Sequence, residues 1–209
     1  MRYARLVDDP YCARLTLTTA PAIEPVSVAD LMAHSRIDNA AEGSYLAGLI
    51  TASRQWIEQY LGRQLITATW TMKLDEFPAG DDLELPRPPL LTVASVKYYD
   101  VNRALQTVDA SSYYVHTFAG PEAAPGMLER IQGFAWPTAY DGDGAVEIAF
   151  TAGYGATANL VPLQIRQAIM IHAAELYERR EQLAGGAFGG ALIPSAITVE
   201  RLLWPLRVW

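Results

Sequence analysis

The fold depends on one stretch, Ser44-Tyr-Leu-Ala-Gly-Leu-Ile-Thr-Ala-Ser-Arg-Gln-Trp-Ile-Glu-Gln-Tyr-Leu61. Its apolar residues recur every three or four positions, which predicts an α-helix with one apolar face. Ser53 fills the middle of this face, and Gly62 follows as a C-cap. The apolar members are Tyr45, Leu46, Leu49, Ile50, Trp56, Ile57, Tyr60 and Leu61. A helix with one apolar face needs a partner that covers it.

The expected partner is a second long helix near the other end of the chain, over about 162–184. Pro162 suits its first turn, and Gly185-Gly186 ends it. Its apolar stripe consists of Ile165, Ile169, Ala173, Leu176 and Tyr177. We therefore expect helices 44–61 and 162–184 to pack together, although about a hundred residues separate them.

A shorter helix is predicted over about 28–36, ahead of the first long one. Ser27 is a good N-cap, and Asp30 follows three residues later. Before this helix, residues 1–25 show no helical period, although Leu15-Thr16-Leu17-Thr18 alternates briefly. We interpret residues 1–25 as an extended arm that packs on the core or on a neighbouring molecule.

Between the two long helices the period changes from that of a helix to that of strands. Apolar and polar residues alternate around Trp70, Leu83, Val96, Tyr113 and Ile148, which indicates antiparallel β structure. Turn residues such as Pro78-Ala79-Gly80 and Pro125-Gly126 separate these runs. Residues 117–143 are rich in Gly, Pro and Ala, and we expect them to be mostly loop.

The predicted fold class is therefore α+β: a helical bundle with a β-sheet insertion between the second and the last long helix. Residues 26–64 and 156–190 form the bundle, and residues 65–155 form the insertion lobe. The arm, 1–25, precedes them, and a C-terminal tail, 191–209, follows a Gly-rich hinge. The tail contains Trp204 and Trp209, which either anchor an interface or fold back on the helices.

The composition excludes several classes of protein. The 209 residues include 16 basic and 23 acidic ones, a net charge of −7, which argues against a generic nucleic-acid binder. The lone Cys12 excludes a disulfide within the chain and a multi-cysteine metal site. No signal peptide or membrane-spanning run is evident, so we expect a soluble protein that is made in the cytoplasm.

Catalytic motifs are not found. His34, His116 and His172 fall in three different predicted elements, and no nucleophile elbow or Walker loop is present. Carboxylates cluster at 75–76, 81–84 and 141–143, beside Gly or Pro, where Asp is common in solvated turns. We predict no catalytic, cofactor-binding or metal-ligating residue. A carboxylate-based hydrolase and a monomeric binding module remain as alternatives.

Several stretches resemble one family, the head–tail connector (adaptor) proteins of tailed bacteriophages and gene transfer agents. No single motif decides the resemblance; the order and spacing of the stretches do. They are Val28–Asp38, Leu49–Arg63, Leu85–Leu90, Phe150–Gly155, Val161–Ile169 and Leu176–Glu181, with a weaker match around Leu202–Val208.

The resemblance implies a structural protein without catalysis. Connectors of this family form a ring, typically of twelve copies, beneath the portal protein, where the ring lengthens the DNA channel. The ring is a platform for the next neck or tail protein, such as a stopper or tail-terminator protein. Double-stranded DNA passes through the lumen without specific binding, and no membrane is involved. This chain would be made in a bacterial cytoplasm and end in the neck of a virion or gene transfer agent particle.

Two sets of site residues follow from these expectations. In the family the C-terminal segment reaches toward the portal, so the tail is expected to dock on the portal or an adjacent subunit. Its docking residues are Leu202, Leu203, Trp204, Leu206, Arg207, Val208 and Trp209. Contacts between subunits are expected along the helices, and the residues expected there are Arg54, Glu58, Arg166 and Glu178. The alternative for these four is a solvated helix face.

Overall fold

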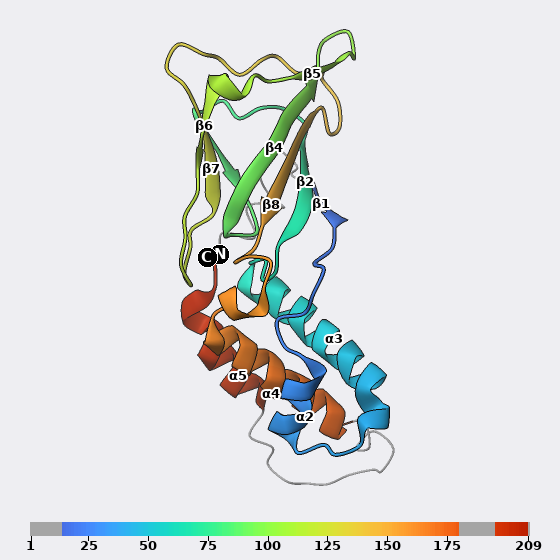
Figure 1. Ribbon diagram of the computed structural model, residues 1–209. Helices are drawn as coiled ribbons and strands as arrows, with labels where there is room; N and C mark the ends of the chain where they lie inside the picture. Colours follow the sequence, from blue (N-terminus) through green and yellow to red (C-terminus); the bar gives the residue numbers. More distant parts are fainter. Residues whose placement is uncertain (1–13, 180–194, 209) are drawn as a thin grey trace.

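The computed structural model describes residues 14–179 and 195–208, and it is an α+β structure. The helices lie together at one end and two antiparallel sheets lie at the other (Figure 1). The helices are α2 (Val28–Ser35), α3 (Gly43–Leu61), α4 (Leu163–Arg179) and α5 (Ser195–Leu203). The strands are β1 (Arg14–Thr19), β2 (Ala68–Leu74), β3 (Asp82–Leu85), β4 (Leu90–Tyr99), β5 (Leu105–Thr107), β6 (Tyr113–His116), β7 (Gly126–Arg130) and β8 (Val146–Ala152).

Helices α3 and α4 are in contact, as their apolar stripes predict. On α4, His172 Nδ1 lies 3.0 Å from the Ser53 hydroxyl oxygen, and the His172 ring stacks on Trp56 with 4.7 Å between ring centroids. The apolar side chains of both helices share one core with α2 and α5. That core includes Leu31, Leu46, Ile50, Ile57, Leu61, Ile165, Ile169, Ala173, Val199 and Leu203.

Local signals explain where α2 and α3 begin and end. The Ser27 hydroxyl accepts a hydrogen bond from the Asp30 backbone N–H, and the Asp30 carboxylate accepts one from the Ser27 N–H, which makes a capping box. At the end of α3, Gly62 has φ of 70°, the left-handed conformation that glycine adopts without steric cost.

The sheets enclose a second core. The larger sheet has the order β1-β2-β8-β4-β5, and the smaller one β3-β7-β6. Strand β8 is central, and its alternate residues Val146, Ile148 and Phe150 are fully buried. This spacing follows from the two-residue period of a strand.

The arm and the predicted loop region contain strands that the sequence analysis did not assign. Residues 14–19 form β1 and pair with β2 at the edge of the larger sheet. Within 117–143, residues 126–130 form β7, the middle strand of the smaller sheet. Gly126 therefore begins a strand and is not a turn residue. A Cβ at this position would lie 2.2 Å from a Leu90 methyl carbon, so glycine permits this close packing.

The tail lies on the helices of its own chain. Val199 and Leu203 of α5, and Leu206 in the short 3₁₀ helix η4 (Trp204–Leu206), are buried in the helical core. The Val208 N–H donates to the Leu61 carbonyl oxygen at 2.9 Å. Of the two alternatives for the tail, folding back on the helices therefore describes residues 199–208. The glycine hinge, the end of helix 162–184 beyond Arg179, Cys12 and Trp209 lie outside the described residues.

The helical core extends past residue 65, where the insertion lobe was expected to begin. Leu65 and Ile66 are buried in the helical core, and Ile66 forms a parallel β-bridge with Gly155. Gly153 lies beside this bridge with φ of +133°, and a Cβ there would lie 2.7 Å from the Thr67 nitrogen. The two strands that leave the sheet thus pass into the helices as a close pair. In the described residues no helix is long and apolar enough to cross a membrane.

Candidate functional site

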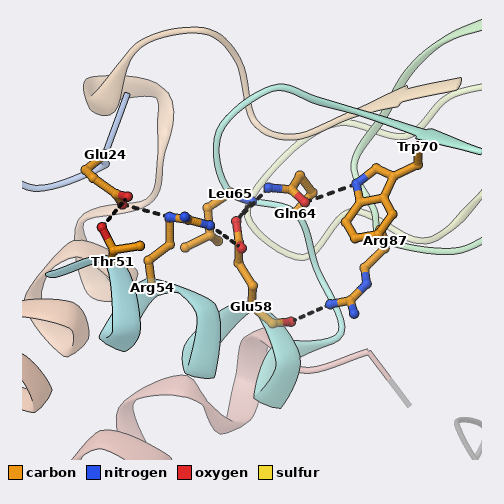
Figure 2. Close-up of polar contacts among 8 residues, drawn as sticks. All are labelled: Glu24, Thr51, Arg54, Glu58, Gln64, Leu65, Trp70 and Arg87. Carbon is orange, nitrogen blue, oxygen red and sulfur yellow. Dashed lines mark hydrogen bonds and ion pairs between the residues drawn. The ribbon is translucent and has the colours of Figure 1, made fainter. Parts of the chain in front are cut away.

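A buried polar network lies between the helices and the sheets (Figure 2). Arg54 is its centre: Nε donates to Glu24 Oε2 at 2.7 Å, and Nη1 donates to Glu58 Oε2 at 2.7 Å. Thr51 Oγ1 donates to the other oxygen of Glu24 at 2.9 Å. Only 7% of Arg54 and 8% of Glu58 is exposed. The expectation that these two residues lie on a face open to neighbouring subunits is therefore wrong.

The other oxygen of Glu58 extends the network toward the sheets. Glu58 Oε1 accepts hydrogen bonds from Gln64 Nε2 at 2.6 Å and from the Leu65 N–H at 3.1 Å. Gln64 Oε1 in turn accepts from the indole nitrogen of Trp70, on β2, at 3.1 Å. Arg87 donates to the Glu58 carbonyl oxygen and lies over the Trp70 ring. The network therefore joins α3 to the first strand of the insertion.

Burial and pairing act against each other on these charges. Burial raises the pKa of the Glu58 carboxyl, although the nearby Arg54 charge opposes this shift. Burial acts to lower the pKa of Arg54, but the hydrogen bond to Glu24 and the charges of Glu58 and Glu24 outweigh it and raise the pKa. Arg54 is thus a fixed positive charge that holds two carboxylates.

Arg63 forms a second buried contact between separate parts of the chain. Its Nε donates to the Leu206 carbonyl oxygen in η4, and its Nη1 donates to the Ala123 carbonyl oxygen at 2.6 Å. Tyr154 Oη donates to the Pro121 carbonyl oxygen at 2.7 Å in the same loop. Arg63 therefore holds the tail and the β6–β7 loop to the end of α3.

The sequence analysis did not predict Glu24, Gln64 and Arg87 as partners of Arg54 and Glu58. The sequence did contain a signal that Arg54 and Glu58 themselves are buried. Arg54 follows Ile50 by four residues and Glu58 follows Arg54 by four, so both lie beside the apolar stripe of α3. A charged pair in that position is expected to be buried or to border the core.

The remaining predicted interface residues lie closer to the surface. Glu178 is exposed near the end of α4, and Arg166 is half-buried. The Arg166 Nε is buried and has no hydrogen-bond partner within the described residues. Arg166 lines a groove with Gly120, Pro121, Tyr154, Asn159, Leu160, Val161, Pro162 and Leu163.

The predicted docking residues of the tail divide into two groups. Leu203 and Leu206 are buried in their own core, so the expectation that they dock on another protein is wrong. Arg207 lies over the Tyr60 ring of α3, 5.0 Å from its centroid, and Leu202 and Val208 are half-buried. Trp204 is different, because 55% of it is exposed.

Charge is distributed unevenly along the chain. Residues 65–155 contain twelve of the 23 acidic residues but only five of the 16 basic ones. This stretch, which forms most of the two sheets, therefore carries the whole net charge of −7, and the rest of the chain is neutral. An anionic polymer would be repelled by the sheet end of the molecule.

The clustered carboxylates are used as caps and ion pairs. Asp75 accepts from the Gly144 N–H at 2.6 Å and from Arg14 at 2.9 Å, and these contacts lower the pKa of its carboxyl. Asp81 is in an ion pair with Arg130. Outside the clusters, Asp109 caps a turn, and the hydrogen bond from the Ser111 N–H lowers the pKa of its carboxyl. A glycosidase acid needs a raised pKa in a cleft. Among the described residues, no group of three or more His, Cys, Asp or Glu could hold a metal ion.

Comparisons with known proteins identify similar chains in gene transfer agent (GTA) particles. A chain in the neck of an empty GTA particle, determined with C6 symmetry, is 27% identical with a TM-score of 0.75, and the match covers 94% of this chain and 96% of that one. A chain in the virion of a native GTA particle is 27% identical with a TM-score of 0.75, covering 93% and 95%. The predicted resemblance to head–tail connectors of gene transfer agents is confirmed.

A third similar chain comes from the neck of a native GTA particle determined with C12 symmetry. It is 26% identical, with a TM-score of 0.70 and coverage of 94% and 96%. Neither a family model nor a curated protein matches the chain. The similar chains are thus components of a particle neck or virion.

Proposed function

We propose that the chain is a head–tail connector, a structural subunit of the neck of a virion or gene transfer agent particle. The observation that carries the proposal is the end-to-end match to a chain in a particle neck, over 94% of this chain and 96% of that one. Because both chains are covered, the likeness extends over helices and sheets together. In this proposal the protein is made in the bacterial cytoplasm and incorporated into the neck.

In the proposed particle, copies of the chain form a closed ring beneath the portal. The similar chains come from neck structures with C6 and C12 symmetry, and twelve copies would agree with both. A ring of this kind uses two different surfaces of each subunit, which meet in a heterologous contact. Arg166 and Glu178, on α4, remain candidates for that contact.

The acidic charge of the sheet end supports a channel through which DNA passes without being bound. DNA phosphates are attracted to basic surfaces, and the affinity grows with each neutralised phosphate. The net charge of −7 over residues 65–155 has the opposite effect. We infer that the lobe can border the DNA channel without retaining the duplex.

The tail is proposed to contact the portal through Trp204 instead of through the whole apolar segment. Leu203 and Leu206 hold η4 on the helices, so Trp204 is presented from an ordered element. An exposed tryptophan on an ordered surface is a typical interface anchor. A stopper or tail-terminator protein is the partner proposed for the opposite side of the ring.

Reconstitution with the portal protein of the same particle tests this proposal. The purified chain and portal are mixed, and complexes are examined by light scattering and electron microscopy. We expect closed rings of the chain stacked on the portal, and we expect Trp204→Ala to lower the portal-bound fraction while Val101→Ala, at an exposed site far from the tail, does not. A chain that stays unbound and monomeric beside an intact portal would contradict the connector role.

A further inference from the structure

Strand β6 has an edge that no described strand covers. The smaller sheet has the order β3-β7-β6, so β6 pairs with β7 on one side only. The Ile131 N–H donates to the Ser112 carbonyl oxygen at 3.1 Å, so residue 112 faces β7. Hydrogen-bonding direction alternates along an antiparallel strand, and the peptide groups of Tyr113 and Val115 therefore face away from β7. Such groups are a template for a further strand.

The side chains along this edge are also exposed and apolar. Tyr114 is 60% exposed and Val115 is 41% exposed, and Phe118 just beyond the strand is exposed as well. Val115 pairs with Leu128, and Leu128 pairs with Leu83, so this row faces the buried side of the sheet. If the added strand has an apolar residue opposite Val115, that residue would cover the exposed part of the Val115 side chain.

The opposite face of the sheet is acidic. Register places Tyr114, Glu129 and Asp82 in one row, and His116, Met127 and Glu84 in the next. The His116 ring already lies 2.7 Å from the Glu129 carboxylate. Side chains of an added strand on this face would extend rows that contain three carboxylates. Cross-strand pairing with carboxylates favours lysine or arginine at these positions.

Among the described residues, a second copy of the chain offers no other edge strand of this kind. The other edge strands described are β1, β3 and β5, with the sequences Arg-Leu-Thr-Leu-Thr-Thr, Asp-Leu-Glu-Leu and Leu-Gln-Thr. None alternates apolar with basic residues, and Arg14 of β1 is already paired with Asp75 and Asp143. No described edge strand of this chain therefore supplies the complementary charge.

We propose that the free edge of β6 binds an extended segment of another neck protein, as an added antiparallel or parallel strand of alternating apolar and basic residues. The identity of the partner as a neck protein rests on the proposed function, but the chemistry of the segment rests on the edge itself. About five or six residues suffice for a strand of this kind.

The test uses the full chain and a fluorescent peptide of alternating valine and lysine, about seven residues long. Two control peptides are used: one with proline in place of the central valine, which keeps the charge but cannot complete a ladder, and one with glutamate in place of lysine. Binding is measured by fluorescence anisotropy, and the bound amides are located by hydrogen exchange. Val115→Lys is the edge variant, and Val101→Lys, at another exposed position of the sheet end, is its matched control.

We expect saturable binding of the valine–lysine peptide, slower exchange at Tyr113 and Val115, and at least tenfold weaker binding of both control peptides. Val115→Lys should weaken binding at least tenfold, and Val101→Lys should leave it within twofold. If the proline peptide bound as tightly as the valine–lysine peptide, charge attraction alone would explain the binding and the proposal would be wrong. The absence of any binding would also overturn it.

Self-association is the remaining outcome to distinguish. If the chain alone associates with increasing concentration and Val115→Lys abolishes this, a second copy occupies the edge and the proposal is wrong. The peptide measurement needs no ring and no portal. A failed portal reconstitution with intact peptide binding would therefore contradict the connector role and leave the strand site standing.

Discussion

Arg54 holds two carboxylates in a site that is almost closed to water, and its removal has a definite expected cost. Arg54→Ala leaves Glu58 buried without its charged partner, so we predict that the free energy of unfolding falls by about 3–5 kcal/mol. Urea denaturation monitored by tryptophan fluorescence measures this. The double variant Arg54→Met with Glu58→Leu removes this buried ion pair but leaves Glu24, Gln64 and the Leu65 N–H without these partners, so it should recover only part of the loss. A change below about 0.5 kcal/mol for Arg54→Ala would show that the pair is not important for the fold.

His172 predicts a pH dependence of stability. Burial lowers the pKa of its imidazole from 6.5, although the Glu175 charge opposes this shift. The folded state therefore binds the proton less readily than the unfolded state. The resulting stability is present above pH 6.5 and is lost as the pH falls through the lower folded pKa.

Unfolding free energies between pH 5 and 8 test this dependence. We expect a decline toward low pH of less than about 1 kcal/mol per pH unit, because the ring is only partly buried. His172→Gln should remove this part of the slope. An unchanged slope in His172→Gln would contradict the assignment.

At the scale of elements, α5 and η4 complete the helical core of the described chain. Leu203→Ala should lower the free energy of unfolding by about 2–5 kcal/mol, since it leaves a cavity in a fully buried site. The neighbouring Trp204→Ala should cost less than about 1 kcal/mol because the side chain is mostly exposed. Chemical denaturation of both variants decides this. An equal loss of unfolding free energy in the two variants would contradict the assignment of Leu203 to the core and Trp204 to the surface.

Gly153 and Gly48 allow a comparison of the same substitution, glycine to alanine, at a crowded and an open position. Gly153→Ala forces a Cβ against the Thr67 nitrogen at a left-handed φ, and should destabilise the protein by about 1–3 kcal/mol or more. Gly48, inside α3, has nothing within 4 Å of an added Cβ. Gly48→Ala should raise the unfolding free energy by about 0.5–1 kcal/mol. Thermal or urea unfolding of both variants shows whether the signs are opposite, as expected.

Elements with local signals could be predicted from the sequence, and elements that depend on distant contacts could not. Helices α2 and α3 agree with prediction because a capping box, an apolar period and Gly62 act within a few residues. Strand β7 is not predicted because Gly126 resembles a turn signal, whereas the glycine is there to allow close packing against the distant Leu90. The tail was ambiguous because apolar residues alone do not show which surface covers them.

The candidate site shows the same limit. The sequence identifies Arg54 and Glu58 as interface candidates because charged residues are usually exposed, but their position beside Ile50 and Ile57 places them at the core. Their partner Glu24 lies in the arm, 30 residues before Arg54 in the sequence, and only the folded chain brings the two together.

For the whole molecule, the likeness to particle-neck chains and the separation of charge lead to the same account. The helical end is neutral and contains the tail, while the sheet end carries the net charge of −7. A connector needs surfaces for its own copies and for its partners, and it must let DNA pass. In the proposed connector role, the acidic lobe, the exposed Trp204 and the β6 edge that no described strand covers are the surfaces assigned to these purposes.

Cryo-electron microscopy of the particles that contain this protein tests the central claim most directly. The account predicts density in the neck, beneath the portal, into which α3, α4 and the two sheets fit as a closed ring of twelve copies, with Trp204 in contact with a protein neighbour. Absence of the chain from purified particles that have an intact neck, or density for a different fold at that position, would contradict it.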